Sequence, residues 1–246
     1  MRIAFLTDLH IGAEDEQFLG VDVRQNFLKA LDFLTEMKPN CLVLGGDITN
    51  AGGTQAVYEW VKKQTDKLPF PCYVIAGNHD ESAIVADVFN KSHDLYNGEL
   101  YYALPLDGRP ALFLDSSKGE FSPEQWTWFR DYLSALRDTN VVVFMHHPPL
   151  LADVLFMDQK YPFRQSDEFV KAVRDLPCHI MVICGHYHVE KVVQRGNLTV
   201  LLSPSTFYQM KQDSPEFAID NYQIGIREIN LTTHGTNSTV IYLEFN

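Results

Sequence analysis

Short apolar runs rich in β-branched residues recur along this chain and alternate with stretches of helical periodicity. Each run has the length of a buried strand, and alternation with helices predicts a layered α/β fold. Strands are expected at Ile3–Leu6, Cys41–Leu44, Cys72–Ala76, Ala111–Leu114, Val141–Met145, Ile180–Cys184 and Val200–Leu202. Helices are expected at Asp22–Met37, Thr54–Lys67, Pro123–Arg137 and Ser166–Arg174, with Ser122 and Ser166 as N-caps.

The pattern changes to strands alone after Val189, with runs at Asn197–Leu202, Tyr222–Ile229 and Val240–Phe245 separated by turn residues. These runs predict added antiparallel strands. No low-complexity linker, fixed repeat or charge block marks a boundary, so residues 1–246 are expected to form a single domain. A chain of 246 residues can bury a large core without disulfides, and its four scattered cysteines are expected to be buried, reduced thiols.

Charge and hydropathy exclude several function classes. The chain has 20 Lys and Arg against 32 Asp and Glu, a net charge of −12 that repels nucleic acid polymers and anionic membranes. No apolar run approaches the roughly 20 residues of a membrane-spanning helix. Asp8 interrupts the first apolar run too early for a signal peptide, so a cytoplasmic location is expected.

Polar clusters follow the expected strands, at the edge where α/β proteins bind ligands. Any one of them fits an ordinary turn or a buried core histidine. Together they hold six of the nine histidines, with carboxylates and an amide that core packing does not require, and so they predict a metal site. The clusters are Asp8-Leu9-His10, Gly45-Gly46-Asp47, Gly77-Asn78-His79-Asp80, His146-His147 and Gly185-His186-Tyr187-His188.

The spacing within two clusters supports a metal site. In an extended segment the side chains of Asp8 and His10 project to the same side, as do those of His186 and His188. Each pair is therefore expected to bind at one metal position. Imidazole, carboxylate and amide ligands without a thiolate suit Mn, Fe or Zn. More than four candidate ligands imply two divalent ions.

Taken in order, these clusters resemble the motif blocks of the calcineurin-like metallophosphoesterases, from residue 8 to residue 188. Four flanking motifs resemble the class III cyclic-nucleotide phosphodiesterase branch. They are Phe18-Leu19-Gly20-Val21-Asp22, Leu114-Asp115-Ser116-Ser117, Gln125-x-x-Trp128 and His146-His147-Pro148-Pro149.

The resemblance implies a four-layer αββα sandwich, in which two mixed sheets are flanked by helices. It implies that Asp47 bridges two divalent ions. Each ion is expected to be Mn, Fe or Zn, and a mixed Fe/Mn centre is included. It also implies a catalytic histidine, His79, that is not a ligand. The implied ligands are Asp8, His10 and His188 for the first ion and Asn78, His146 and His186 for the second.

Charge arithmetic favours a hydroxide nucleophile. Two divalent ions, the Asp8 and Asp47 carboxylates and a bridging hydroxide leave the ligand sphere at about +1. A metal lowers the pKa of bound water to about 7, so hydroxide can attack at neutral pH. His79 would then protonate the departing alkoxide, and Asp47 and His79 form the expected catalytic pair.

The expected function is a phosphodiesterase acting on a small diester such as a 3′,5′-cyclic nucleotide. A phosphatase, or a hydrolase of 2′,3′-cyclic or glycerophosphodiesters, could use the same core because specificity lies in the surrounding loops. A nuclease is disfavoured by the net charge. A non-catalytic metal-binding scaffold, as in the retromer subunit that resembles this fold, is disfavoured because His79 and every ligand position are present.

Several features stay open at this point. Phosphoprotein phosphatases of the superfamily carry an acidic residue three places after the Gly-Asp aspartate with Arg beside it, whereas here Asn50 stands there and no Arg follows. Asn50 either orients His79 or closes an Asx turn. His147 is expected to pack behind the ligands. Residues 150–163 either wall the pocket or pack in the core or a dimer, and a homo-oligomer is left open.

Overall fold

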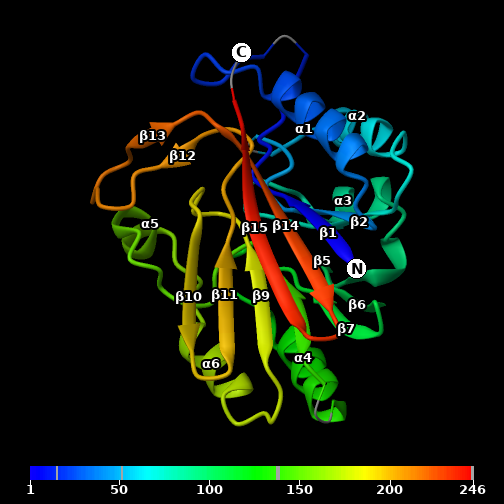
Figure 1. Ribbon diagram of the computed structural model, residues 1–246, viewed down its shortest axis with the longest axis vertical. Coiled ribbons are helices and arrows are strands. Elements are labelled where there is room, and N and C mark those ends of the chain that lie inside the picture. Colours follow the sequence, from blue (N-terminus) through cyan, green and yellow to red (C-terminus); the bar gives the residue numbers. More distant parts are fainter. Residues whose placement is uncertain (15, 51, 137–138, 245–246) are drawn as a thin grey trace.

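Two β-sheets packed face to face form the centre of the molecule, as the computed structural model shows for residues 1–14, 16–50, 52–136 and 139–244 (Figure 1). The first sheet has the strand order β15-β14-β1-β2-β3 and the second β10-β11-β9-β8-β7-β6. The first sheet comprises β1 (Arg2–Leu6), β2 (Cys41–Gly45), β3 (Cys72–Ile75), β14 (Ile224–Thr232) and β15 (Gly235–Leu243). The second comprises β6 (Tyr102–Leu106), β7 (Arg109–Phe113), β8 (Val141–Phe144), β9 (Ile180–Cys184), β10 (Lys191–Arg195) and β11 (Leu198–Leu202).

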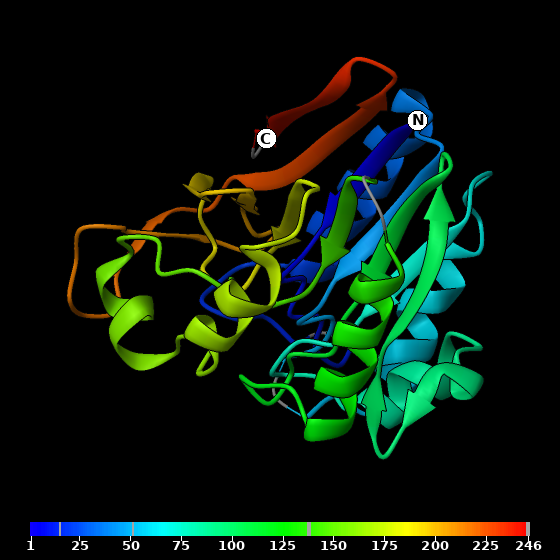
Figure 2. The same ribbon diagram turned by 90° about the horizontal axis from the view of Figure 1, so that it is seen from below.

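Helices cover the two outer faces, and Figures 1 and 2 show α1 and α2 on one side of the sheets and α4 and α6 on the other. The helices are α1 (Val23–Met37), α2 (Gln55–Thr65), α3 (Ser82–Val88), α4 (Pro123–Ala135), α5 (Leu155–Lys160) and α6 (Ser166–Val173), with a 3-10 turn at Ser92–Asp94. Two hairpins complete the fold, β4 (Leu95–Tyr96) with β5 (Glu99–Leu100) and β12 (Gln209–Met210) with β13 (Ile219–Asn221).

Strand β8 shows how the layers arise from the sequence. Its residues Val142 and Phe144 belong to the core between the sheets, whereas Val141 and Val143 belong to the core beneath α4 and α6. A strand buried on both faces needs an unbroken apolar run, because successive side chains point to opposite faces. The expected four-layer αββα sandwich is therefore confirmed.

Parallel pairing brings the strand ends together. Strands β1, β2 and β3 run parallel in one sheet, and β7, β8, β9 and β11 run parallel in the other. Two of the three expected antiparallel additions are present, since β14 pairs antiparallel with β1 and β15 with β14. The third, β11, runs parallel to β9 and is antiparallel only to β10. The loops that follow the parallel strands of both sheets therefore gather at one edge.

The local predictions hold for one N-cap and fail for the other. Ser122 caps α4 by accepting a hydrogen bond from the Gln125 N–H at 3.1 Å. Ser166 is not a cap; it is the first residue of α6, and its hydroxyl donates to the Phe163 carbonyl. The helix end expected at Arg137 and the strand end expected at Phe245 lie outside the described residues.

No pattern in the sequence predicts α3, α5, β6, β10 or the two short hairpins. The two helices are only 7 and 6 residues long, too short to show a helical period. The cysteines are free thiols, as expected, but Cys72 is half-buried whereas Cys41, Cys178 and Cys184 are buried. Burial raises the pKa of Cys41 to about 12. Among the described residues, no helix is long and apolar enough to cross a membrane.

Candidate metal centre

The loops at the carboxyl edge of the two sheets are tied to one another by backbone hydrogen bonds. The N–H of Asp8, after β1, donates to the Gly46 carbonyl at 3.0 Å, and the N–H of His10 donates to the Asp47 carbonyl at 2.9 Å. The N–H of His186, after β9 in the other sheet, donates to both carboxylate oxygens of Asp8 at 3.1 Å. The site therefore spans the junction of the two sheets.

Five side chains of this edge lie on residues with left-handed backbone conformation. Their φ angles are 55° for Asp8, 47° for His10, 48° for Asp47, 66° for His186 and 51° for His188. Non-glycine residues enter this region at a cost of roughly 1–2 kcal/mol each, and such residues gather at functional sites. The extended geometry expected for the two pairs is wrong, and His186 and His188 join different groups of side chains.

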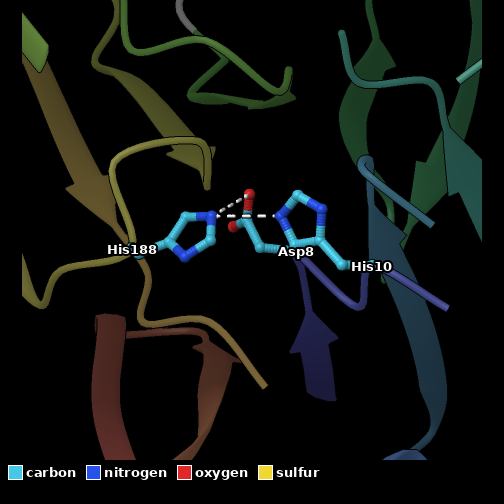
Figure 3. Close-up of side chains that lie close together, drawn as sticks. All are labelled: Asp8, His10 and His188. Atoms are coloured by element: carbon cyan, nitrogen blue, oxygen red, sulfur yellow. Dashed lines mark hydrogen bonds and ion pairs between the residues drawn. The ribbon is translucent and has the colours of Figure 1, made fainter. Parts of the chain in front are cut away.

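The first group consists of Asp8, His10 and His188, all buried (Figure 3). The Nε2 atoms of His10 and His188 lie 3.2 Å apart, and Nε2 of His188 lies 3.3 Å from Oδ1 of Asp8. Figure 3 shows both imidazole rings directed at the same point beside the Asp8 carboxylate. One atom from each side chain lies within 4.8 Å of the others, close enough to share one ion.

The second group consists of Asp47, His146 and His186, likewise buried. Oδ2 of Asp47 lies 3.3 Å from Nε2 of His146 and 3.8 Å from Nε2 of His10, so Asp47 lies between the groups. The expected amide ligand Asn78 is exposed and lines the pocket beside these side chains. The structure thus brings all seven sequence-predicted ligand positions to one place.

Backbone carbonyls fix the protons of three histidines. A carbonyl only accepts, so Nδ1 of His146 carries a proton toward the Gly45 carbonyl, and Nδ1 of His188 carries one toward the Tyr208 carbonyl. Nε2 of His186 donates to the Tyr161 carbonyl in the same way. Metal-binding histidines are usually held in this manner, since the second ring nitrogen is then aimed at the ion.

A buried polar atom without a partner tests whether the residues fit a metal. Nε2 of His146 is inaccessible to solvent and has no hydrogen-bond partner among the described residues, although it faces the carboxylates of Asp47 and Asp8. Buried polar atoms are rarely left unpaired, because the lost hydration is costly. A divalent ion between imidazole nitrogens and carboxylates would satisfy these atoms, so the donor set fits.

The protonation behaviour follows from burial and from the two carboxylates. Burial disfavours charge on His146, but the adjacent Asp47 outweighs it and raises the pKa of His146 to about 9. Burial lowers the pKa of His10 to about 3, and burial together with the charge of His146 lowers that of His186 to about 4. Burial opposes ionisation of Asp47, yet His146 holds its pKa well below 3.8. Charged carboxylates and neutral imidazoles are the forms that bind metals, so Asp47, His10 and His186 are already in the binding form, whereas His146 has to release a proton when an ion binds.

His79 lies at the rim of the site. Its side chain is 35% exposed, and its Nε2 lies 3.9 Å from Oδ2 of Asp47. The His79 N–H donates to Oδ1 of Asp47 at 2.8 Å, and its ring meets the His10 ring edge-on. These contacts also make a third group, His10 with Asp47 and His79, that could hold an ion. His79 therefore reaches both the buried carboxylate and the solvent.

Asp80 has a part that the sequence did not reveal. Its carboxylate accepts hydrogen bonds from the N–H groups of Ile48, Thr49 and Gly77 and from the Tyr58 hydroxyl. Burial, with the charge of Asp47, raises the Asp80 pKa to about 6. The only available signal was its place in the Gly-Asn-His-Asp cluster. Asp80 positions the loop of His79 against the loop of Asp47.

A pocket of about 460 Å³ opens above the two groups. The metal-site residues line one side of this pocket. The other side is apolar and comes from α5 and the β12–β13 hairpin, which lie side by side in Figures 1 and 2. Residues 150–163 both wall the pocket and pack in the core. Phe156, Met157 and Tyr161 line the pocket, whereas Phe163 is buried in the core. The apolar wall consists of Phe156, Met157, Tyr161, Tyr208, Met210 and Phe217.

His147 packs behind the ligands, as expected. Its ring centroid lies 4.0 Å from that of His186, and its Nδ1 lies 3.2 Å from the Ser116 hydroxyl. It belongs to none of the candidate ligand groups among the described residues. Asn50 donates its backbone N–H to the Ile11 carbonyl, which does not decide between the two uses of its side chain.

Replacing Gly185 with alanine should destabilise the protein. A Cβ at Gly185 would overlap the Thr7 hydroxyl and lie 2.5 Å from Oδ2 of Asp8. Overpacking of this kind costs about 1–3 kcal/mol, which urea unfolding would measure as a lower free energy of unfolding. Gly20→Ala introduces no overpacking, because its new Cβ meets no atom within 4 Å, but its φ of 76° adds a backbone strain that Gly185 does not have. Unfolding of Gly185→Ala at the wild-type midpoint would contradict this close approach.

Comparison with known proteins finds related chains. A model of the calcineurin-like phosphoesterase family matches residues 1–190. A probable cyclic nucleotide phosphodiesterase of Fibrobacter succinogenes is 32% identical over 221 residues, 90% of this chain and 86% of the relative. A glycerophosphodiester phosphodiesterase of Enterobacter lignolyticus is 26% identical, over 85% of this chain and 79% of its own. A dimetal phosphatase from Danio rerio, 13% identical, shares the fold with a TM-score of 0.67 over 98% of both chains.

Proposed function

The chain belongs to the calcineurin-like phosphoesterase family, and from this premise we propose that it hydrolyses small phosphodiesters such as 3′,5′-cyclic nucleotides with two divalent metal ions. The family resemblance in the sequence is thereby confirmed, and the chain is a phosphoric ester hydrolase with phosphodiesterase relatives. One observation carries the proposal: two groups of histidine and aspartate meet at Asp47, beneath an open pocket.

We assign Asp47 to both ions. When bound, the ions would lower the pKa of a water molecule to about 7 and offset negative charge on the phosphate. The ligand residues would hold the ions while the backbone carbonyls of Gly45, Tyr161 and Tyr208 keep three imidazole rings in place. The other assignments are Asp8, His10 and His188 for one ion and Asn78, His146 and His186 for the second.

We assign His79 to proton transfer. Its ring faces the pocket, and its Nε2 lies 3.9 Å from Oδ2 of the Asp47 carboxylate. A protonated imidazole at this rim can give its proton to the oxygen that leaves the phosphate. Its 35% exposure allows the proton to be replaced from solvent.

The test is hydrolysis of bis(p-nitrophenyl) phosphate and p-nitrophenyl phosphate by purified protein that has been stripped with a chelator and reloaded with Mn²⁺. We expect activity to return with the metal and to favour the diester. A preference for the monoester would make the chain a phosphatase. Failure to hydrolyse either ester with Mn²⁺, Fe²⁺, Zn²⁺ or Mg²⁺ would refute the enzyme and favour a scaffold.

The apolar wall supports a nucleotide rather than a glycerol ester. Phe156 of α5 meets Phe217 of the β12–β13 hairpin with ring centroids 6.1 Å apart, and Tyr208 meets Phe217 at 5.8 Å. Phe217 remains 49% exposed beside the metal centre, where a planar base could stack on it. A glycerol arm has no flat face to use this surface.

Phe217→Ala should therefore lower kcat/KM for a 3′,5′-cyclic nucleotide about tenfold relative to that for a glycerophosphodiester, because stacking on an aromatic ring contributes about 1–3 kcal/mol. Initial rates on both esters measure this ratio. The matched control is Tyr222→Ala, which removes another exposed aromatic ring outside this pocket. An unchanged ratio in Phe217→Ala would speak against base stacking there.

Four further points are part of the proposal. The donor set of imidazole, carboxylate and amide favours Mn, Fe or Zn, including a mixed iron and manganese centre. Residues 1–246 form one domain, which is supported by the pairing of β14 with β1. The substrate is a small phosphate ester and no nucleic acid polymer, in keeping with the net charge of −12. The cytoplasmic location and the oligomeric state stay predictions.

A further inference from the structure

A second pocket of about 390 Å³ adjoins the metal centre. Its described lining contains three basic side chains, Lys118, Lys160 and Arg164, and no acidic one. This is unusual in a chain whose net charge is −12. The concentration of positive charge beside a phosphate-binding centre calls for an explanation.

The two pockets meet at the second group of ligands. Asn78, Tyr161 and His186 line both pockets, whereas Asp8, His10 and His188 do not line the second one. The second pocket therefore begins where the apolar pocket ends, on the side of His186. A diester has two arms, so a phosphate held at the ions would send one arm toward each pocket.

Arg164 is held in place at the floor of the second pocket. Its Nε donates to Glu120 at 3.1 Å and its Nη2 donates to the Lys118 carbonyl at 2.7 Å, while within the described residues Nη1 makes no hydrogen bond. A Cβ on Gly119 would lie 3.0 Å from Nη1 of Arg164 and 3.9 Å from Nε2 of His147. Glycine thus keeps space open beside these two nitrogens.

The charges are only partly neutralised by neighbours. Glu120 pairs with Arg164 at 3.1 Å, and Nζ of Lys118 lies 3.7 Å from Glu99. Lys160, at the end of α5, is exposed, and no ion pair involves it among the described residues. An anionic group entering the pocket would meet a guanidinium that is already oriented, and a fixed fork of this kind binds phosphate and carboxylate well.

From this arrangement, and resting on the proposed function, we propose that the second pocket binds an anionic group on the second arm of a linear phosphodiester. The preferred substrates are then open diesters that pair a planar group with an arm ending in phosphate or carboxylate. The apolar pocket selects the first arm, and Lys118, Lys160 and Arg164 select the second. A 3′,5′-cyclic nucleotide would use the first pocket alone.

The test uses three esters of 4-nitrophenyl phosphate that share one leaving group. The second arm is 2-phosphonoethyl, 2-methoxyethyl or choline, which carry negative, zero and positive charge at its end. We expect kcat/KM of the Mn²⁺-loaded wild type to be about tenfold higher for the phosphonate than for the methoxy ester, and lowest for choline. In both Arg164→Ala and Lys160→Ala this ratio should fall toward one.

Lys160→Ala guards against a purely structural effect, because Arg164 is hydrogen-bonded to the Lys118 and Gly119 carbonyls, whereas no side-chain hydrogen bond or ion pair holds Lys160 within the described part of the chain. Arg195→Ala is the matched charge control. Arg195 is the last residue of β10 and lies opposite Leu198, at the start of β11 and away from the loops that form the site, so its loss should leave the ratio unchanged. Equal rates on all three esters would overturn the second pocket while leaving the phosphodiesterase intact. The proposal would also be overturned if sulfate changed the rates of the wild type but not of Arg164→Ala while all three esters reacted equally well. That result would indicate a site for free anions. No hydrolysis of any ester would refute the proposed function and this inference together.

Discussion

Asp47→Asn should lose metal-restored phosphodiesterase activity by on the order of 10³-fold or more. Asp47 belongs to the second ligand group and lies beside the first, because its Oδ2 is 3.3 Å from Nε2 of His146 and 3.8 Å from Nε2 of His10. An amide keeps the shape of the side chain but removes the negative charge that binds cations. The same change should lower the metal content and the rise in melting temperature on adding Mn²⁺, since ligands that bind only the folded state stabilise it.

The measurements are initial rates on bis(p-nitrophenyl) phosphate, metal content by mass spectrometry and thermal melts with and without Mn²⁺. Asp66→Asn is the matched control, because Asp66 is 59% exposed and its ion pair with Lys62 lies on the surface of α2. Asp47→Asn retaining two ions and wild-type rates would contradict the assignment of Asp47 to both.

His79→Ala should lower kcat by about 10²–10⁴-fold on a 3′,5′-cyclic nucleotide, whose leaving oxygen is a poor leaving group that needs a proton. The effect on bis(p-nitrophenyl) phosphate should be much smaller, because nitrophenolate leaves without protonation at neutral pH. Metal content should stay near that of the wild type. This pattern follows from a ring at the pocket rim, 35% exposed, with Nε2 3.9 Å from the Asp47 carboxylate.

The His79 experiment also decides between two uses of the same side chain. The structure allows His79, with His10 and Asp47, to hold an ion. Loss of one ion in His79→Ala, with equal loss of activity on both esters, would identify a ligand instead of a proton donor. His93→Ala serves as control, since His93 is 73% exposed and pairs with Asp94 in the 3-10 turn.

The layered fold and the location of the site can be predicted from two patterns in the sequence, the apolar runs and the polar residues that follow them. Continuous apolar runs such as Val141–Met145 fill two cores at once, and only a strand between two layers requires that. Polar residues directly after such strands must gather at one edge when the strands are parallel. These two rules predict that five polar clusters gather at one edge, whereas the choice of seven ligands within them is implied by the resemblance to the phosphoesterase family.

The detailed geometry could not be predicted because it depends on backbone conformations that the sequence does not signal. Asp8 and His10, one residue apart, were expected on a common face of an extended segment, yet both adopt left-handed conformations. His186 and His188 also adopt left-handed conformations, and they belong to different ligand groups. The apolar wall escaped prediction in part, since Tyr208 and Phe217 come from the β12–β13 region, far from α5 in sequence.

The pairing of β14 with β1 also bears on how the protein is made. Ile3 lies opposite Ile229, so a strand from the start of the chain completes its hydrogen bonds only with one synthesised more than 200 residues later. Contacts of such high sequence separation slow folding, because the entropy of closing the intervening loop must be overcome first. Until then β1 has an unpaired edge on the ribosome, and Asp8 and His10 at its end lack the completed sheet beneath them. Metal uptake is therefore expected to follow the synthesis of β14 and its pairing with β1.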